Sequence, residues 1–165
     1  MSPPYTPKRI KRRVDKVCYT ANFDGGTTTI NERQCIYWGF QIRDTIHQSN
    51  GFTSSYTTNN EAEYIALIKL LEHLVDIISS PSEINIYGDS KLVINQVFGD
   101  WKVKAFNLQR LNLYAKELVD RLVSSGCVNI NGKHMPREFP EQSAVDKWAR
   151  EALTKEHKEQ GGETI

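Results

Sequence analysis

Residues Val17 to Asp24 alternate between apolar and polar side chains, so that the apolar ones share one face. A period of two is typical of a strand with one buried face. We expect the Gly25-Gly26 pair to end this strand. Two more β-rich segments follow after short polar breaks, Gln34 to Arg43 and Thr45 to Thr57. Three strands at this spacing predict an antiparallel meander.

From residue 61 onward the hydrophobic period becomes that of a helix. The predicted helices are Glu61 to Ile78, Ser90 to Phe98, Phe106 to Val123 and Glu141 to His157, and the strands between them are Ile84 to Tyr87 and Val128 to His134. The order β-β-β-α-β-α-α-β-α predicts an α/β fold. We expect one five-stranded mixed sheet with helices on both faces.

The domain is expected to span residues 17–158, between two flexible tails. Residues 1–16 contain three prolines, which do not fit regular structure, and carry a net charge of +5. Because the whole chain carries +1, the other 149 residues carry −4. A basic tail of this kind either contacts nucleic acid or is a solvated leader. Residues 159–165 are polar and rich in glycine, and form the second predicted tail.

Length and composition exclude several classes of protein. At 165 residues and 39% hydrophobic, the chain is long enough for one domain with a real core. It has neither an apolar run of membrane-spanning length nor an apolar signal segment. Three cysteines without a CxxC motif favour neither a disulfide framework nor a zinc site. We expect a cytoplasmic monomer, or a nuclear one in a eukaryotic host.

Acidic residues occur on faces that ought to be apolar. On the helix from residue 61, Glu63 shares the apolar stripe that continues through Ala66 and Leu67, whereas Glu61 is expected to face solvent. The alternative for Glu63 is a capping box with Asn60 as the N-cap.

Three aspartates complete this acidic set. Asp24 ends the first strand and Asp89 ends the fourth, while Asp146 lies on the apolar stripe of the last helix. Each has a structural alternative, respectively a turn residue, an N-cap, and a surface partner of Arg150. Four carboxylates at one end of a sheet would repel one another unless divalent cations neutralised them, and oxygen ligands suit Mg²⁺ or Mn²⁺.

Four segments carry a resemblance to a known family. They are Phe23-Asp24-Gly25-Gly26, the block from Thr57 to Tyr64 (TTNNEAEY), Ile86-Tyr87-Gly88-Asp89-Ser90, and Pro136-Arg137-Glu138 with Ala144-Val145-Asp146. Together they resemble type 1 ribonuclease H over roughly residues 17–154, and a combination in this order is far more specific than a lone motif. The resemblance implies the ribonuclease H fold. It also implies a metal set made of Asp24, Glu63, Asp89 and Asp146.

The resemblance implies hydrolysis of the RNA strand of RNA–DNA hybrids, with 5′-phosphate and 3′-hydroxyl products. Two Mg²⁺ ions (Mn²⁺ being the alternative), about 4 Å apart, would flank the reacting phosphate. Asp24 would bridge them, Glu63 and Asp89 would hold one, and Asp146 the other. The implied substrate contacts are Gly25, Thr58, Asn59, Asn60 and Trp101, although the asparagines also suit helix capping and the tryptophan also suits a core position.

The sequence departs from most members of the family at three places. Pro136 stands where they carry a catalytic histidine, a pattern that resembles an archaeal and bacterial subgroup. We therefore interpret His134 as a strand-end residue, and Arg137 and Glu138 as better candidates for assisting product release. Gln142 stands where asparagine is common. Thr27 to Asn31 replaces the usual first loop.

Three alternative functions remain. Integrases and transposases share the superfold, but they use a different order of acids and lack the TTNN block. A non-catalytic hybrid-binding domain is disfavoured because all four acids are present. A detached nuclease domain of a reverse transcriptase is the third, and the starting Met favours a free-standing enzyme over it.

Overall fold

The computed structural model describes residues 16–163, except for the side chains of residues 127–128 and 155–163. The elements, in chain order, are β1 (Val17–Ile30), β2 (Arg33–Ile42), β3 (Gln48–Thr53), α1 (Asn59–Ile77), β4 (Ser82–Gly88), α2 (Lys91–Val97), α3 (Phe106–Ser124), β5 (Cys127–His134) and α4 (Pro140–Glu163). This is the predicted order. The predicted N-terminal tail, apart from Lys16, lies outside the described residues.

The strands form one mixed sheet in the order β3-β2-β1-β4-β5. β1 pairs antiparallel with β2, and β2 pairs antiparallel with β3, which confirms the predicted meander. β1 also pairs parallel with β4, and β4 with β5. The central strand β1 therefore joins the antiparallel half of the sheet to the parallel half.

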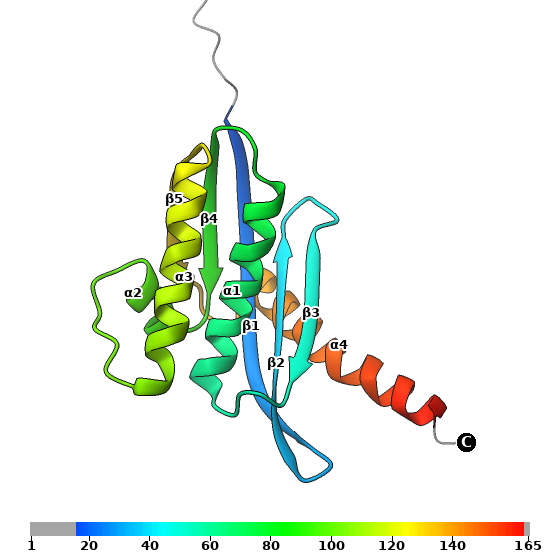
Figure 1. The fold of residues 1–165 in the computed structure, drawn as a ribbon. Helices are drawn as coiled ribbons and strands as arrows, with labels where there is room; N and C mark the ends of the chain where they lie inside the picture. Colours follow the sequence, from blue (N-terminus) through cyan, green and yellow to red (C-terminus); the bar gives the residue numbers. More distant parts are fainter. Residues whose placement is uncertain (1–15, 164–165) are drawn as a thin grey trace, which may run out of the picture.

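Helices cover both faces of this sheet (Figure 1). α1 packs on β1 and β2 and against α3, while α2 and α3 also contact β5. α4 packs on β1, β2 and β3 from the other side. Residues carried by α4 therefore approach the central strand from the face opposite to α1.

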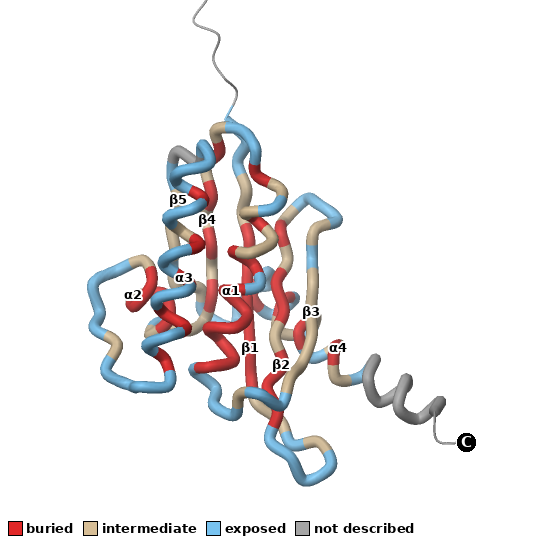
Figure 2. The backbone as a smooth tube through the Cα atoms, viewed as in Figure 1, coloured by how far each residue is buried: buried red, intermediate tan, exposed pale blue. Residues whose placement is uncertain are grey.

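The core lies between the sheet and its helices, where buried positions concentrate (Figure 2). The apolar stripe predicted for α1 is buried as expected, including Leu67, Leu70, Leu71 and Leu74 at 0% exposure. It packs with the inward side chains of the central strands, such as Phe23 and Ile86. Burying this stripe fixes the rotation of α1 about its axis, and with it the direction of every other side chain on the helix.

Gly25-Gly26 does not end the first strand, contrary to the sequence prediction. β1 continues to Ile30, with Gly25 opposite Trp38 and Gly26 opposite Tyr37 on β2. A Cβ at Gly25 would collide with the backbone carbonyl of Ala62. The glycine is needed because α1 approaches the strand closely, and not because the chain turns there.

Other boundaries also differ from the prediction. β3 begins at Gln48 because the chain first turns through Asp44, whose φ is +58°, and Ile42 N–H donates to the His47 carbonyl. α4 runs to Glu163, beyond the predicted end at His157. No described helix is long and apolar enough to span a membrane.

Candidate active site

The four predicted carboxylates come from four different elements. Asp24 lies in the middle of β1 and Glu63 in the first turns of α1. Asp89 directly follows β4, and Asp146 lies in the second turn of α4. All four line one cavity of about 440 Å³. The fold therefore brings together residues that are up to 122 positions apart in the sequence.

Three of these side chains are close enough to share a cation. One carboxylate oxygen from each of Asp24, Glu63 and Asp89 lies within 4.8 Å of the other two. Asp24 is 3% exposed and Glu63 is 9% exposed. The Oε2 atom of Glu63 is buried and has no hydrogen-bond partner. A buried carboxylate oxygen without a donor is costly unless a cation or water binds it, so the donor set suits a divalent metal.

The local electrostatics favour protonation when no cation is present. Burial, together with the neighbouring carboxylates of Asp146 and Asp89, raises the pKa of Asp24 from 3.8 to about 9. Burial, followed by repulsion from Asp24 and Asp89, raises the pKa of Glu63 well above its usual value. Asp24 thus interacts with carboxylates on both sides of the cavity. Cations would reverse these shifts by favouring the charged forms.

Two arginines flank the cluster, and each is paired with one of its carboxylates. Arg137 Nε lies 3.3 Å from Asp89 Oδ2, and Arg150 Nε lies 3.2 Å from Asp146 Oδ1. The Arg150 guanidinium also lies over the Tyr37 ring, 5.2 Å from its centre. Both arginine side chains are more than half exposed, at 71% and 56%. Asp146 therefore pairs with Arg150, as its structural alternative predicted, and it also lines the cavity.

The capping box of α1 begins at Thr58 and not at Asn60, which is the N-cap in the structural alternative. Thr58 is the N-cap: its hydroxyl accepts from Glu61 N–H at 3.2 Å, and Glu61 Oε1 accepts from Thr58 N–H at 3.1 Å. Glu61 is consequently only 9% exposed and does not face solvent as predicted. Neither Asn60 nor Glu63 takes part in the capping box. The capping alternative is therefore wrong for Glu63, and Ser90, not Asp89, is the N-cap of α2.

Several predicted substrate contacts lie beside the carboxylates. Gly25, Asn59 and Asn60 line the same cavity. Thr27 Oγ donates to Asn59 Oδ1 at 3.2 Å, which links the extended end of β1 to the start of α1. Thr58 is engaged in the cap and does not line this cavity.

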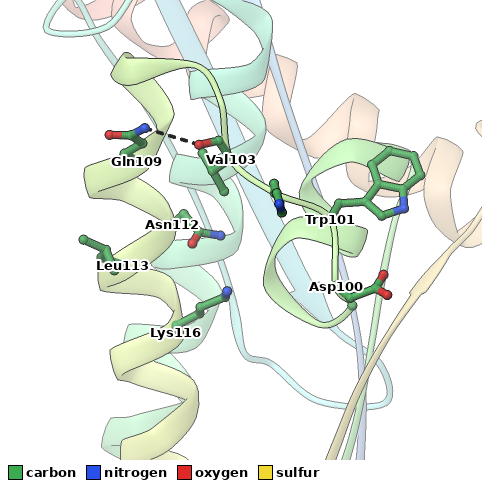
Figure 3. Close-up of a pocket in the computed structure, with 9 residues that line it drawn as sticks. Asp100, Trp101, Val103, Gln109, Asn112, Leu113 and Lys116 are labelled. Atoms are coloured by element: carbon green, nitrogen blue, oxygen red, sulfur yellow. Dashed lines mark hydrogen bonds between the residues drawn. The ribbon is translucent and has the colours of Figure 1, made fainter.

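Trp101 lies in a different place from the carboxylates. It is 49% exposed, so the core alternative is wrong. It lines a groove of about 440 Å³ between the loop after α2 and the first turns of α3, where Gln109 Nε2 donates to the Val103 carbonyl at 3.3 Å (Figure 3). His134 ends β5, opposite Gly88, and neither His134 nor Glu138 lines the carboxylate cavity.

The sequence did not identify every residue at the site. Tyr37 and Arg150 both line the carboxylate cavity. Arg150 was recognisable only as a helix partner of Asp146, at i+4. Tyr37 reaches the site because β2 pairs with β1 in a register that sets it opposite Gly26, and no local pattern reveals that register.

A comparison with protein-family models identifies the relatives of this chain. The RNase H model matches residues 16–153. The chain belongs to the RNase H family. A curated relative, Ribonuclease HI of Halobacterium salinarum, is 34% identical over 134 residues, which is 81% of this chain and 63% of the relative. The predicted likeness to type 1 members is confirmed. The chain spans less than two thirds of the length of this relative, 20% of the relative YpeP of Bacillus subtilis and 24% of the relative Rv2228c of Mycobacterium tuberculosis.

Solved structures show the same RNase H fold. The N-terminal RNase H domain of Rv2228c from Mycobacterium tuberculosis superposes with a TM-score of 0.69 at 27% identity, covering 88% of this chain and 99% of that chain. LC11-RNase H1, solved in complex with an RNA/DNA hybrid, superposes with a TM-score of 0.67 at 28% identity, covering 83% of this chain and 97% of that one.

Proposed function

We propose that this RNase H chain is an endonuclease that hydrolyses the RNA strand of RNA–DNA hybrids with the help of two divalent cations. The observation that carries the proposal is the set of Asp24, Glu63 and Asp89, with ligand oxygens within 4.8 Å of one another in a cavity that Asp146 also lines. The hybrid bound by LC11-RNase H1 supports the choice of substrate.

The residues present fit divalent cations with oxygen ligands. Glu63 brings a buried oxygen without a donor. Burial, followed by the effect of the neighbouring carboxylates, raises the pKa values of both Asp24 and Glu63. Such a cluster is stable in its charged form only with bound cations. We expect Mg²⁺, with Mn²⁺ as an effective substitute, because carboxylate oxygens are the ligands that both prefer.

The four carboxylates would divide between two cation positions. Asp24 interacts with both Asp89 and Asp146, which suits it to be the shared ligand, with Glu63 and Asp89 on one side and Asp146 on the other. When bound, such cations lower the pKa of an attacking water and neutralise charge on the leaving 3′ oxygen. The products would carry 5′-phosphate and 3′-hydroxyl ends.

Neighbouring side chains of the cavity would bind the hybrid and release the product. Asn59 and Asn60 both donate and accept hydrogen bonds, as recognition of 2′-hydroxyl groups in a wide minor groove requires. Arg137 lies within reach of Asp89, and its exposed guanidinium suits it to bind the new 5′-phosphate and assist its departure. Glu138 directly follows Arg137 and His134 lies three residues before it, and both are accessory candidates for that step.

Cleavage of an end-labelled hybrid tests this function directly. The full chain should cut the RNA strand in Mg²⁺ or Mn²⁺, and it should cut nothing in EDTA. Single-stranded RNA, RNA duplex and DNA duplex are the controls for substrate. Absence of metal-dependent cleavage of the hybrid would contradict the proposal, whereas equal cleavage of the RNA duplex would reject the substrate assignment only.

A further inference from the structure

A network of buried amide side chains lies on the α4 side of the sheet. In the sequence, its members are close to the carboxylates of the candidate site. Gln142 is 0% exposed and Asn22 is 2% exposed. Asn22 Nδ2 donates to Gln142 Oε1 at 3.0 Å, and Gln142 Nε2 donates to the Phe23 carbonyl at 2.9 Å. Both ends of the Gln142 amide are therefore bonded to β1. Buried hydrogen bonds of this kind hold two elements in one relative position.

The network connects the two elements that carry Asp24 and Asp146. Gln142 lies one helical turn before Asp146 on α4, and Phe23 directly precedes Asp24 on β1. Positions four apart on a helix lie on the same face, so the side chain that is bonded to β1 and the carboxylate that lines the cavity project from the same side of α4. A shift of α4 along β1 would break both Gln142 hydrogen bonds and move Asp146 relative to Asp24.

Two further contacts anchor Asn22. Arg43 Nε donates to Asn22 Oδ1 at 3.3 Å, and Asn22 Nδ2 also contacts Met135 Sδ at 3.3 Å. Met135 N–H in turn donates to the Gly88 carbonyl at 2.8 Å, immediately before Asp89. The network therefore reaches the backbone immediately before Asp24 and Asp89, and on α4 it lies one helical turn before Asp146.

We propose that Gln142, with Asn22, is a positioning residue that fixes the separation of Asp24 and Asp146 and thereby sets the relative affinity of the site for Mg²⁺ and Mn²⁺. Mg²⁺ demands near-ideal octahedral geometry and tolerates displaced ligands poorly. Loosening the packing of α4 on β1 should therefore weaken the binding of Mg²⁺ more than the binding of Mn²⁺. The inference rests on the proposed function only in taking these carboxylates as cation ligands.

The competing explanation is that Gln142 merely satisfies buried polar groups. The chain offers a matched control in Gln96, which is 4% exposed and lies among the helices on the other face of the sheet. Its amide also makes two hydrogen bonds, accepting from Tyr64 Oη at 2.6 Å and donating to the Lys102 carbonyl at 3.3 Å. Gln96→Met and Gln142→Met each remove one buried amide and keep a similar volume, so both should lower stability.

Calorimetric titration of the full chain with MgCl₂ or MnCl₂ separates the two explanations without requiring activity. We expect Gln142→Met to weaken Mg²⁺ binding by up to about 10-fold, the lower end of the effect of removing a group that is hydrogen-bonded directly to a metal ligand, and Mn²⁺ binding by clearly less. Gln96→Met should bind both cations like the unmodified chain. Equal effects of the two variants would overturn the proposal.

Kinetics and a milder variant complete the test. With a hybrid substrate, Gln142→Met should lower kcat in Mg²⁺ more than in Mn²⁺, while KM for the hybrid stays unchanged. Should Gln142→Met fail to fold, Gln142→Asn keeps the amide but shortens its reach, and it should shift the Mg²⁺-to-Mn²⁺ ratio in the same direction. An unchanged ratio in a folded Gln142→Asn variant would also overturn the proposal. If the unmodified chain binds the cations but cleaves no hybrid, the proposed function fails while the titrations still decide this inference.

Discussion

Arg150 Nε lies within hydrogen-bonding distance of both carboxylate oxygens of Asp146, at 3.2 and 3.3 Å. The pair is an i,i+4 contact on α4, and its Asp146 side chain is 26% exposed. Exposed pairs of this type contribute only about 0.3–0.5 kcal/mol to stability. Removing the charge of Asp146 should therefore affect the chemistry of the cavity far more than the fold.

Asp146→Asn should abolish or severely reduce hybrid cleavage while the protein stays folded. A cation site supplies several kcal/mol of transition-state stabilisation, so a missing ligand should lower kcat by roughly 100-fold or more. Single-turnover cleavage in Mg²⁺ measures the loss, and circular dichroism checks the fold. We expect the same of Asp24→Asn, and near-normal rates in either variant would contradict its assignment as a ligand.

In the absence of cations, Asp24→Asn should also raise the melting temperature above about pH 4. Burial and neighbouring carboxylates raise the pKa of Asp24 to about 9 in the folded chain, so its neutral form is favoured on folding. That stabilisation is fully present below the unfolded pKa of about 3.8 and is lost as the pH rises toward 9. Asparagine is neutral at every pH, so the Asp24→Asn variant does not lose this stability as the pH rises.

Thermal melts in EDTA from pH 3.5 to 9 measure this effect. The advantage of Asp24→Asn should be absent near pH 3.5 and grow with pH, to about 1–3 kcal/mol or roughly 3–10 °C for a chain of this size. Saturating Mg²⁺ should reverse the order, because the unmodified cluster binds cations more tightly. A constant difference at every pH would exclude ionisation of Asp24 as the cause.

Glu63→Gln should damage activity far more than Glu61→Gln, although both glutamates are 9% exposed. Glu63 belongs to the carboxylate set, whereas Glu61 belongs to the capping box with Thr58. Glutamine is also accepted at the third position of a capping box, so Glu61→Gln should keep both the fold and the rate. Parallel kinetics in Mg²⁺ measure the contrast, and equal losses would contradict the division of roles.

Hydrophobic periodicity predicted the features that depend on a single helix or strand, such as which of its side chains face the sheet. The stripe through Leu67 and Leu74 selected Glu63 over Glu61 as the acid facing the sheet, and Glu63 does lie in the cavity. The same stripe predicted the wrong environment for Glu61. Its angular position on the helix predicts that it faces solvent, but its hydrogen bonds to Thr58 hold the side chain against the start of the helix. Gly25 was misread because its close neighbour, Ala62, lies on another element. The contacts of Gln142 and Tyr37 depend on register and helix docking, which no local pattern contains.

The enzyme should require several consecutive ribonucleotides in its substrate. Asn59 and Asn60 adjoin each other at the start of α1 beside the carboxylates, which suits recognition of more than one 2′-hydroxyl group. Duplexes of equal length that contain one, two, four or eight ribonucleotides in one strand measure this requirement. Efficient incision at a single embedded ribonucleotide would contradict it.

The basic segment at residues 1–16 should strengthen binding of the hybrid through its phosphates. The remainder of the chain carries −4, yet in the proposed function it must approach a polyanion. The short connection between α2 and α3 offers only Lys102 and Lys104. Six lysines and arginines precede β1, together with a single acidic residue, Asp15. This segment is therefore a concentrated source of positive charge that phosphates would attract.

Deleting residues 1–16 leaves β1 intact, since the strand begins at Val17. For every phosphate that the truncated chain no longer neutralises, the slope of log K against log salt should fall by about 0.7–0.9. KM for the hybrid should therefore rise at low salt, while kcat at saturation stays unchanged because the carboxylates are untouched. A second variant, with the lysines and arginines of the segment replaced by serine at constant length, separates charge from chain length. If both variants keep the KM and the salt slope of the full chain, the segment is a leader without a role in substrate binding.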